Sequence, residues 1–255
     1  MSDPRSRVLL ITGAAGGIGR ATVKLFTENG WHVIGVDRAE FGKGFPANGL
    51  FIQADISIPD QVNAIYERAS AFTDSLDAVV NNASIQVNKS MLEISVEEWD
   101  LVMASNLRSA FLGVKLAYPL LKARGGGAIV NMSSVHAVAT SVNITAYAAS
   151  KGGLLALTRA MAIEFAHDNI RANAILPGAV DTPMLRDGLG RGHLGGENIT
   201  ERLDNLARKT VNGRIGTPAE IAHAIYFLAD NSQSSFMTGQ ALVVDGGATA
   251  RLSTE

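Results

Sequence analysis

The stretch Thr12-Gly13-Ala14-Ala15-Gly16-Gly17-Ile18-Gly19-Arg20 decides the fold, because it joins an apolar strand-like run to a helical pattern. Glycines in such a loop permit a tight turn and let the backbone approach a pyrophosphate closely. The following helix offers free N–H groups and the positive end of its dipole to the phosphates. The spacing is Gly-x3-Gly-x-Gly rather than the commoner Gly-x-Gly-x2-Gly, and an ordinary tight turn is the alternative interpretation. The predicted dinucleotide-binding residues here are Gly13, Gly16, Gly17, Ile18 and Gly19.

Short runs rich in Val, Ile and Leu alternate with helical patterns on both sides of this loop and along the whole chain. Continuous apolar runs of this length indicate parallel strands covered on both faces, and strand–helix–strand units imply right-handed crossovers. We therefore predict an α/β fold: a single Rossmann-like doubly wound domain over residues 1–255, with a seven-stranded parallel sheet and helices on both faces. The predicted strands are Val8–Thr12, His32–Val36, Leu50–Gln53, Ala78–Asn81, Ala128–Met132, Ala172–Ile175 and Ala241–Val244.

Three helix starts are marked by their own residues. Ser95-Val96-Glu97-Glu98 and Thr217-Pro218-Ala219-Glu220 read as capping boxes, the second with proline at the first helical position. Ser57 followed by Pro59 and Asp60 marks another start.

Composition excludes several classes of function. The 255 residues contain no cysteine, which excludes a disulfide scaffold, a Cys-ligated metal site and a thiol nucleophile, and we predict no metal site. The 22 basic and 24 acidic residues give a net charge of -2, so no basic field for nucleic acid is expected. Apolar runs are too short for a secretory signal or a membrane span, which needs about 18 continuous apolar residues. We expect a cytoplasmic protein with no nucleic-acid or membrane partner.

One glycine-rich stretch, Leu185 to Glu201, stands apart from the helical patterns around it. It contains Gly188, Gly190, Gly192, Gly195 and Gly196. A segment of this kind inside a compact domain is usually a functional lid or a flexible connection. We predict a flexible substrate lid over residues 184–210.

Acidic residues follow the second and third predicted strands. Asp37 lies 18 residues after Gly19, where a carboxylate accepts hydrogen bonds from the adenosine ribose hydroxyls and repels a 2′-phosphate. This favours NAD over NADP, although Arg38 could pair with a 2′-phosphate and Asp37 could simply open a loop. Asp55-Ile56 could hold the adenine edge, or Asp55 could be a loop or cap residue.

The next three strands also end in polar or turn-forming residues. Asn81-Asn82-Ala83-Ser84, Ser133-Ser134 and Pro177-Gly178 follow the fourth, fifth and sixth strands. Paired asparagines are often only turn formers. However, five such loops all follow strand carboxyl ends, which is the edge where open α/β sheets bind ligands.

Tyr147 and Lys151 form the sharpest pair, because residues four apart share one helix face. A free tyrosine has a pKa of about 10, and a nearby ammonium lowers that pKa by favouring the phenolate. Tyr147 could then exchange a proton with a substrate while a hydride moves to or from a nicotinamide. An exposed tyrosine beside a lysine with its charge in solvent is the alternative for an isolated pair.

Together these residues resemble the short-chain dehydrogenase/reductase family over Arg7 to Gly247, nearly the whole chain. Ser134 lies thirteen residues before Tyr147, the spacing usual in that family. The resemblance rests on Thr12 to Gly19, Asn81-Asn82-Ala83, Asn106, Ser134, Tyr147 with Lys151, and Pro177 to Thr182. Ser84 departs from the family pattern, which usually has glycine after Asn-Asn-Ala.

The resemblance implies a role for each matched residue. Tyr147 is the expected general acid/base, and Lys151 is expected to bind the nicotinamide ribose and lower the Tyr147 pKa. Ser134 should hydrogen-bond the reacting oxygen, and Asn106 should hold a water that links Lys151 to solvent. Val180 and Thr182 are expected at the nicotinamide carboxamide. Asn82, Ala83, Pro177 and Gly178 complete the expected cofactor contacts, and a homotetramer is implied.

The substrate is much less constrained. Ser134, His136, Asn143, Tyr147 and Met184 are the candidates for contact, and Ser133 to His136 resembles the same run in family members that oxidise sugars. His136 could equally be structural. Arg186, Arg191 and His193 could also reach a substrate, but solvated loop charges are the alternative for the arginines.

We therefore expect an NAD-dependent oxidoreductase that interconverts a secondary alcohol and a carbonyl on a sugar, polyol or hydroxy acid. A non-catalytic dinucleotide-binding regulator on the same fold is the alternative, although such a protein should lack part of the Asn–Ser–Tyr–Lys set. Nucleotide-sugar epimerases and dehydratases are longer and have different glycine spacing.

Overall fold

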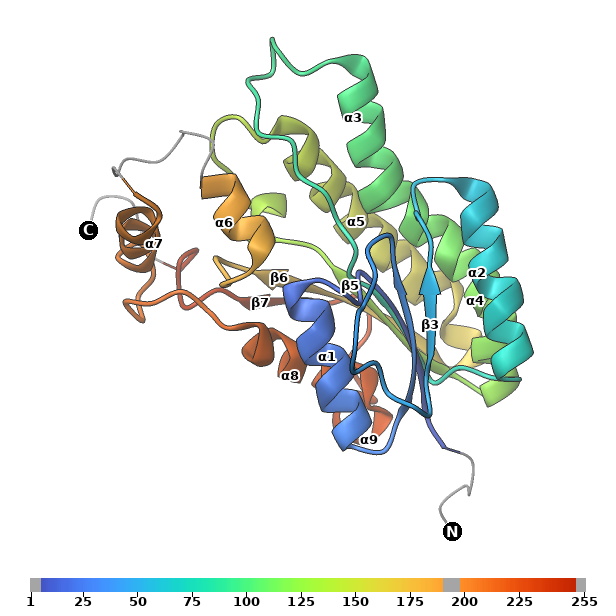
Figure 1. The fold of residues 1–255 in the computed structure, drawn as a ribbon. Helices are drawn as coiled ribbons and strands as arrows, with labels where there is room; N and C mark the ends of the chain where they lie inside the picture. Colours follow the sequence, from blue (N-terminus) through green and yellow to red (C-terminus); the bar gives the residue numbers. More distant parts are fainter. Residues whose placement is uncertain (1–5, 190–197, 251–255) are drawn as a thin grey trace.

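A single sheet of seven parallel strands forms the centre of the computed structural model, which describes residues 6–189 and 198–250 (Figure 1). The strand order is β3-β2-β1-β4-β5-β6-β7. All seven predicted strands are present and all pair in parallel, which confirms the predicted sheet. They are β1 (Val8–Thr12), β2 (His32–Asp37), β3 (Leu50–Gln53), β4 (Ala78–Asn81), β5 (Gly127–Met132), β6 (Ile170–Pro177) and β7 (Ala241–Val244).

The sixth strand is longer than its predicted core of Ala172–Ile175. All eight residues of β6 are buried, including Arg171, a charged residue that apolar patterning does not place inside a strand. The Arg171 guanidinium donates to the carbonyl oxygens of Leu228 at 2.9 Å and Met237 at 3.1 Å, and to Asn231 Oδ1 at 2.8 Å. These acceptors replace water around the buried charge, so the strand extends through it.

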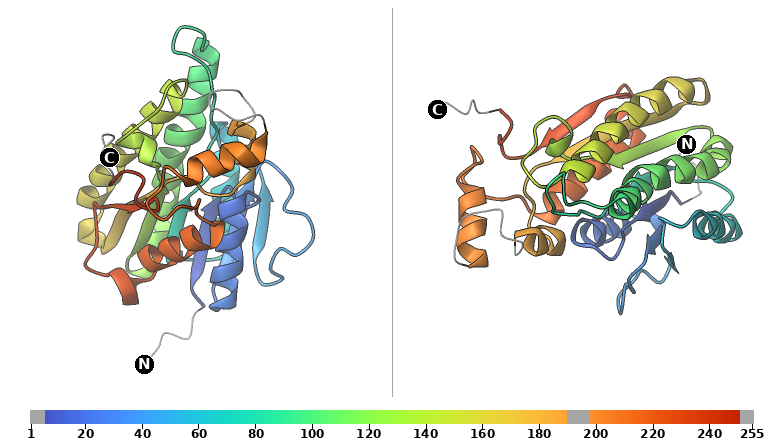
Figure 2. Two further views of the ribbon diagram at one scale, coloured as in Figure 1. Left: turned by 90° about the vertical axis from the view of Figure 1, so that its left-hand side faces the viewer. Right: turned by 90° about the horizontal axis from the view of Figure 1, so that it is seen from above.

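Helices cover both faces of the sheet (Figure 2). α2, α4 and α5 pack on one face, and α1 and α8 pack on the other. The helices are α1 (Gly17–Glu28), α2 (Pro59–Phe72), α3 (Val96–Met103), α4 (Ser109–Arg124), α5 (Thr145–Glu164), α6 (Pro183–Leu189), α7 (Ile199–Ala207), α8 (Pro218–Ala229) and α9 (Asn231–Ser234). A π-helical segment, Ala104–Arg108, joins α3 to α4.

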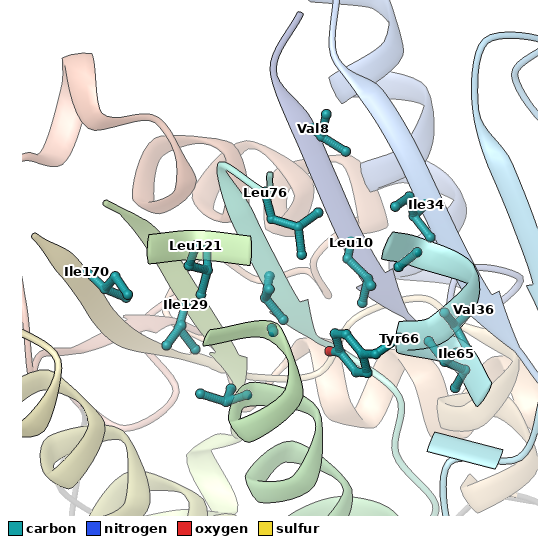
Figure 3. Close-up of a cluster of buried hydrophobic side chains, with 14 of the residues drawn as sticks. Val8, Leu10, Ile34, Val36, Ile65, Tyr66, Leu76, Leu121, Ile129 and Ile170 are labelled. Atoms are coloured by element: carbon teal, nitrogen blue, oxygen red, sulfur yellow. The ribbon is translucent and has the colours of Figure 1, made fainter. Parts of the chain in front are cut away.

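The two faces have separate apolar clusters because successive strand residues point to opposite sides. Leu10 belongs to the cluster under α2 and α4, whereas its neighbours Leu9 and Ile11 belong to the cluster under α1 and α8. Figure 3 shows the first cluster, in which Ile65 and Tyr66 of α2 face the strands.

The predicted capping boxes at Ser95 and Thr217 are both present, and Pro218 occupies the first helical position of α8. α2 begins at Pro59 as expected, but Ile58 rather than Ser57 is the N-cap, and it makes no side-chain cap. Within residues 6–189 and 198–250, no helix combines the length and the apolar character needed to cross a membrane.

Candidate functional site

A cavity of about 1110 Å³ lies along the carboxyl ends of the strands, where β1 and β4 are neighbours. The chain leaves β1 toward β2 and β3 on one side and returns to β4 on the other. Loops after adjacent strands therefore diverge at this point and leave room for a ligand. Residues from all five loops that were expected to carry chemistry line this cavity.

The glycine loop has the geometry that a bound pyrophosphate requires. Gly13 has φ +68, and a Cβ there would lie 2.8 Å from the Ala83 Cα. A Cβ on Gly19 would lie 1.9 Å from the Gly13 carbonyl oxygen, so both positions exclude a side chain. Gly16 is the N-cap of α1, which has neither a side-chain cap nor an acidic residue in its first turn. The helix N-terminus thus lies at the cavity with no side chain capping it, which fits a dinucleotide phosphate.

The loop after β4 is tied directly to the glycine loop. Asn82 Nδ2 donates to the carbonyl oxygens of Thr12 at 3.1 Å and Gly13 at 3.0 Å. The backbone N–H of Ala83 donates to Thr12 Oγ1 at 3.1 Å. Asn82 therefore does more than form a turn, because it ties the loop after β4 to the glycine loop and fixes the spacing of two cavity walls.

Asp37 and Asp55 both order loops, in different ways. Asp37 Oδ2 accepts from the backbone N–H of Ala15 at 2.9 Å, and Oδ1 accepts from Ala39 at 3.0 Å. Asp37 therefore lines the cavity while holding the glycine loop, and Arg38 lines the cavity beside it. Asp55 Oδ1 accepts from the N–H of Ser57 at 2.8 Å, which is the loop role given above as the alternative.

The end of β6 and the start of α6 close the cavity against the glycine loop. Pro177, Gly178, Val180 and Thr182 all line it. A Cβ on Gly17 would lie 3.0 Å from the Thr182 Cγ2, so the two segments are in contact.

Lys151 is buried beside Tyr147 on α5. Its side chain is 2% exposed, and Nζ donates to the Met132 carbonyl oxygen at 2.7 Å. Nζ lies 5.4 Å from the centroid of the Tyr147 ring. Burial lowers the pKa of the Lys151 ammonium to about 7, because water no longer solvates the charge.

Tyr147 is 9% exposed, and burial raises the pKa of its phenol. The hydroxyls of Ser134 and Ser84 act in the opposite direction and lower that pKa. The expected lowering of the Tyr147 pKa by Lys151 is not found in the free protein, where desolvation of the phenol dominates. The Lys151 ammonium is itself destabilised by burial and donates to the Met132 carbonyl oxygen.

Asn106 lies in the π-helical segment, 2% exposed, and connects α5 to the loop after β4. Its Nδ2 donates to the Ile85 carbonyl oxygen at 2.9 Å and to Ser150 Oγ at 3.0 Å. Its Oδ1 accepts from the N–H of Ile85 at 2.8 Å. Asn106 thus contacts Ser150, the residue of α5 that precedes Lys151, and the neighbour of Asn106, Ser105, lines the cavity.

The candidate substrate residues separate into two groups. His136 and Met184 line the cavity, and the His136 ring centroid lies 6.0 Å from that of Tyr147. Asn143 has φ 65 and is not among the described residues that line the cavity.

The charged residues of the glycine-rich stretch do not reach the cavity within the described part of the chain. Arg186 pairs with Asp181 at 2.7 Å on the surface, which matches the solvated-charge interpretation. Arg191 and His193, with Gly190, Gly192, Gly195 and Gly196, lie outside the described residues.

Sequence patterns missed several cavity residues, because only the tertiary fold brings them there. They come from the loop after β4 and the segment before α5, belong to no motif, and include Gln86, Thr140 and Ser141. Leu206, Lys209 and Thr210 also line the cavity, and they lie within residues 184–210, the predicted lid. Within the described residues, no group of three or more His, Asp or Glu side chains could hold a metal ion.

Comparisons with known proteins agree with this geometry. A family model described as enoyl-(acyl carrier protein) reductase matches residues 13–249. The chain is 35% identical over 254 residues to a 3-oxoacyl-[acyl-carrier-protein] reductase, FabG, of Thermotoga maritima, covering 94% of this chain and 97% of the relative. It is 38% identical over 252 residues to cis-4-hydroxycyclohexanecarboxylate dehydrogenase of Sinomonas cyclohexanicum, covering 96% and 97%.

Solved structures match the whole fold. The ligand-free aldohexose dehydrogenase of Thermoplasma acidophilum has a TM-score of 0.91 at 33% identity, covering 98% of this chain and 96% of that chain. A 3-ketoacyl-(acyl-carrier-protein) reductase from Brucella melitensis, complexed with NADH, has a TM-score of 0.84 at 31% identity, covering 95% and 98%. ElxO with NADP bound has a TM-score of 0.85 at 27% identity, covering 97% and 100%. Similar proteins thus bind either nicotinamide cofactor.

Proposed function

Because the chain belongs to the short-chain dehydrogenase/reductase family, we propose that it interconverts a secondary alcohol and a ketone by hydride transfer, with NAD preferred over NADP. Members of this family are oxidoreductases that bind NAD(P). The observation that carries the proposal is that Tyr147, Ser134 and Lys151 line the same cavity as the glycine loop.

The cofactor would be held along the carboxyl edge of the sheet. NAD, when bound, supplies a nicotinamide ring that accepts or returns a hydride. The uncapped N-terminus of α1 would hold the pyrophosphate, and Lys151 the nicotinamide ribose. The residues proposed to hold it are Gly13, Gly16, Gly17, Ile18, Gly19, Asp37, Arg38, Asp55, Ile56, Asn82, Ala83, Tyr147, Lys151, Pro177, Gly178, Val180 and Thr182.

The preference for NAD rests on Asp37. Its carboxylate already accepts two backbone N–H bonds, and an ionised carboxylate can accept about four, so ribose hydroxyls can still bind. Its negative charge opposes a 2′-phosphate. Titration of protein fluorescence should give a lower Kd for NADH than for NADPH. The ratio of the NADPH Kd to the NADH Kd should be smaller in Asp37→Ala than in the wild type. The reverse order in the wild type would mean that Arg38 outweighs Asp37.

Tyr147 is the proposed general acid/base. In alcohol oxidation its phenolate takes the proton from the substrate hydroxyl, and in ketone reduction its phenol gives that proton to the carbonyl oxygen. Ser134 donates a hydrogen bond to the same substrate oxygen and stabilises its developing charge. Lys151, with a pKa near 7, can exchange protons at neutral pH, and Asn106 is proposed to hold the water that connects it to solvent.

We propose a sugar, polyol or hydroxy acid as the substrate, because hydrogen-bonding groups stand among the largely apolar residues of the cavity. Hydrogen-bonding groups there include His136, Thr140, Ser141 and Lys209. The similarity to an aldohexose dehydrogenase and to a dehydrogenase of a hydroxylated carboxylic acid supports this class. Residues of α6 and α7 line the cavity as well, so we propose that these two helices, the described parts of the predicted lid at 184–210, close over the substrate within a single domain.

A panel of sugars, polyols and hydroxy acids with NAD, read as NADH absorbance, tests the proposal. We expect turnover with one of these classes, and a fall in kcat of at least about 100-fold in Tyr147→Phe with little change in NADH affinity. Retained turnover in Tyr147→Phe would overturn the mechanism. Tight NADH binding without turnover across the panel would favour the non-catalytic regulator.

We also propose a homotetramer, with subunits related by two-fold axes. Within the described part of the chain no strand pairs with the outer edge of β7, where Val243 is exposed, and Phe236 shortly before this strand is exposed as well. Met91, Leu92 and Val96 form a second group of exposed apolar residues before and at the start of α3. Light scattering after size exclusion should give about four times 26.8 kDa, and a monomer would overturn this.

A further inference from the structure

Ser84 and Ser134 occupy equivalent positions after adjacent strands. Asn81 of β4 and Asn131 of β5 are partners in the strand register. Ser84 is the third residue after Asn81, and Ser134 is the third residue after Asn131. Both serines line the cavity, so the parallel sheet delivers two hydroxyls from neighbouring loops to one region of the site.

The two hydroxyls differ in their existing hydrogen bonds. Ser134 Oγ accepts from the backbone N–H of His136 at 3.2 Å. Ser84 Oγ is buried and has no hydrogen-bond partner of normal geometry among the described residues. Burying an unpaired hydroxyl is unfavourable, so its retention at the cavity wall indicates a partner that forms during function.

The Tyr147 phenol is the group on which both hydroxyls act. Each of the two serines favours the ionised phenol, against the effect of burial. A serine hydroxyl can rotate to donate toward a negative charge, and a bond to a charged acceptor is stronger than one to a neutral acceptor. The Ser84 hydroxyl can therefore form its strongest hydrogen bond when Tyr147 is a phenolate.

We propose that Ser84 is a positioning residue that donates a second hydroxyl hydrogen bond to the Tyr147 oxygen in its phenolate form. This rests on the proposed function, in which Tyr147 takes the proton from the alcohol. Ser84 is also the position where the chain departs from the glycine usual in the family pattern. The departure thus adds a donor to the phenolate that a glycine cannot supply.

The expected effect is on the pH dependence of oxidation. Removing one charge-assisted donor should raise the Tyr147 pKa by about one unit, which lowers the rate about tenfold on the acidic limb. The rate on the alkaline plateau should change little, because there the phenolate is formed in either protein. If the Ser84 side chain only filled space, its replacement would leave the acidic limb of the pH profile in place.

The test uses Ser84→Ala and Ser84→Gly, with Ser84→Thr as the variant that keeps the hydroxyl. Ser90→Ala is the matched control, because Ser90 lies in the same loop but its hydroxyl bonds to Glu93 at 2.8 Å, away from the cavity lining. The profile of kcat/KM for oxidation is measured against pH. We expect the acidic limb to move up by about one unit in the alanine and glycine variants, and to stay in place in the threonine variant and the control.

A second measurement does not depend on turnover. The chain has four tyrosines, so 13C-labelled tyrosine gives few resonances, and Tyr147→Phe identifies the relevant one. Its titration, with and without saturating NAD, should move to higher pH in Ser84→Ala. An unchanged titration, or an equal displacement in Ser84→Thr and Ser84→Ala, would overturn the role of Ser84. Absence of turnover in the wild type would overturn the proposed function. The tyrosine titration would still show whether Ser84 donates to the Tyr147 phenolate.

Discussion

Replacing Lys151 by methionine should make the protein more stable at low pH and remove nearly all of its activity. Methionine keeps an unbranched apolar stem of similar length, with sulfur in place of Cδ, and lacks the ammonium. The side chain of Lys151 is 2% exposed, so its charge is separated from water in the folded state. The variant should therefore recover the free energy that burial of this charge costs.

The magnitude follows from the displaced pKa. Burial lowers the pKa of Lys151 from its ordinary value of about 10.5 to about 7. At about 1.36 kcal/mol per pKa unit, the charged form costs about 5 kcal/mol of folding free energy at pH 6. Methionine leaves the Met132 carbonyl oxygen without its donor, which costs about 1–2 kcal/mol. The variant should thus be more stable by about 3 kcal/mol at pH 6 and about 2 kcal/mol at pH 8.

The sign of the pH dependence is fixed by which state binds the proton. Between pH 7 and 10.5 the unfolded chain holds the Lys151 proton and the folded chain does not, so wild-type stability rises with pH in this window. The methionine variant lacks this dependence. The difference between the two proteins should vanish between about pH 9 and 10 and reverse above it.

Urea unfolding at pH 6, 8 and 10, at one protein concentration, measures these differences, because other titrating groups are common to both proteins. Lys115→Met on α4 is the matched control, since Lys115 is exposed and the same atoms are deleted. We expect no pH-dependent difference for the control. A Lys151→Met protein that is less stable than the wild type at pH 6, or a difference that is constant from pH 6 to 10, would refute the reasoning.

Three further predictions concern the cavity and its support. Gly19→Ala would place a Cβ 1.9 Å from the Gly13 carbonyl oxygen, so NADH affinity should fall at least about tenfold and stability by about 1–3 kcal/mol, by fluorescence titration and urea unfolding. Asn131→Ala would leave Asn81 Nδ2 without its buried acceptor at 2.7 Å, and the urea midpoint should report a loss of about 2–4 kcal/mol. Because burial raises the Tyr147 pKa, ketone reduction should stay fast from pH 6 to 9 while alcohol oxidation rises with pH, and steady-state rates in both directions measure this.

Sequence patterns predicted what depends on neighbours along the chain. The seven strands follow from continuous apolar runs, and the glycine loop follows from a strand-to-helix turn that excludes side chains at Gly13 and Gly19. The proximity of Tyr147 and Lys151 follows from their spacing of four on one helix. These features are local, so the residues alone carry them.

What the patterns did not predict depends on burial and on strand register. The sequence alone places a lysine beside Tyr147, but not the Met132 carbonyl that Lys151 Nζ reaches or the loss of solvent that governs both pKa values. In the same way, the sequence marks Ser84 only as a departure from the family pattern, and the pairing of Asn81 with Asn131 brings its loop beside that of Ser134. The full length of the sixth strand was not predicted, because the carbonyl oxygens that accept hydrogen bonds from Arg171 come from distant segments.

Burial of both titratable groups in one cavity sets the state from which catalysis starts. Near pH 8 the free protein holds Tyr147 as a neutral phenol and Lys151 largely as a neutral amine, because each charged form is poorly solvated. In the proposed mechanism a neutral phenol is the form that gives a proton to a ketone oxygen, so under that proposal the free site is already set for reduction. Oxidation needs the phenolate, and its stabilisation must come from donors and positive charge supplied at the cavity rather than from water. Under our proposal, two serine hydroxyls beside Tyr147 provide part of that stabilisation from within the chain, which would explain why Ser84 keeps a buried hydroxyl that has no hydrogen-bond partner of normal geometry among the described residues.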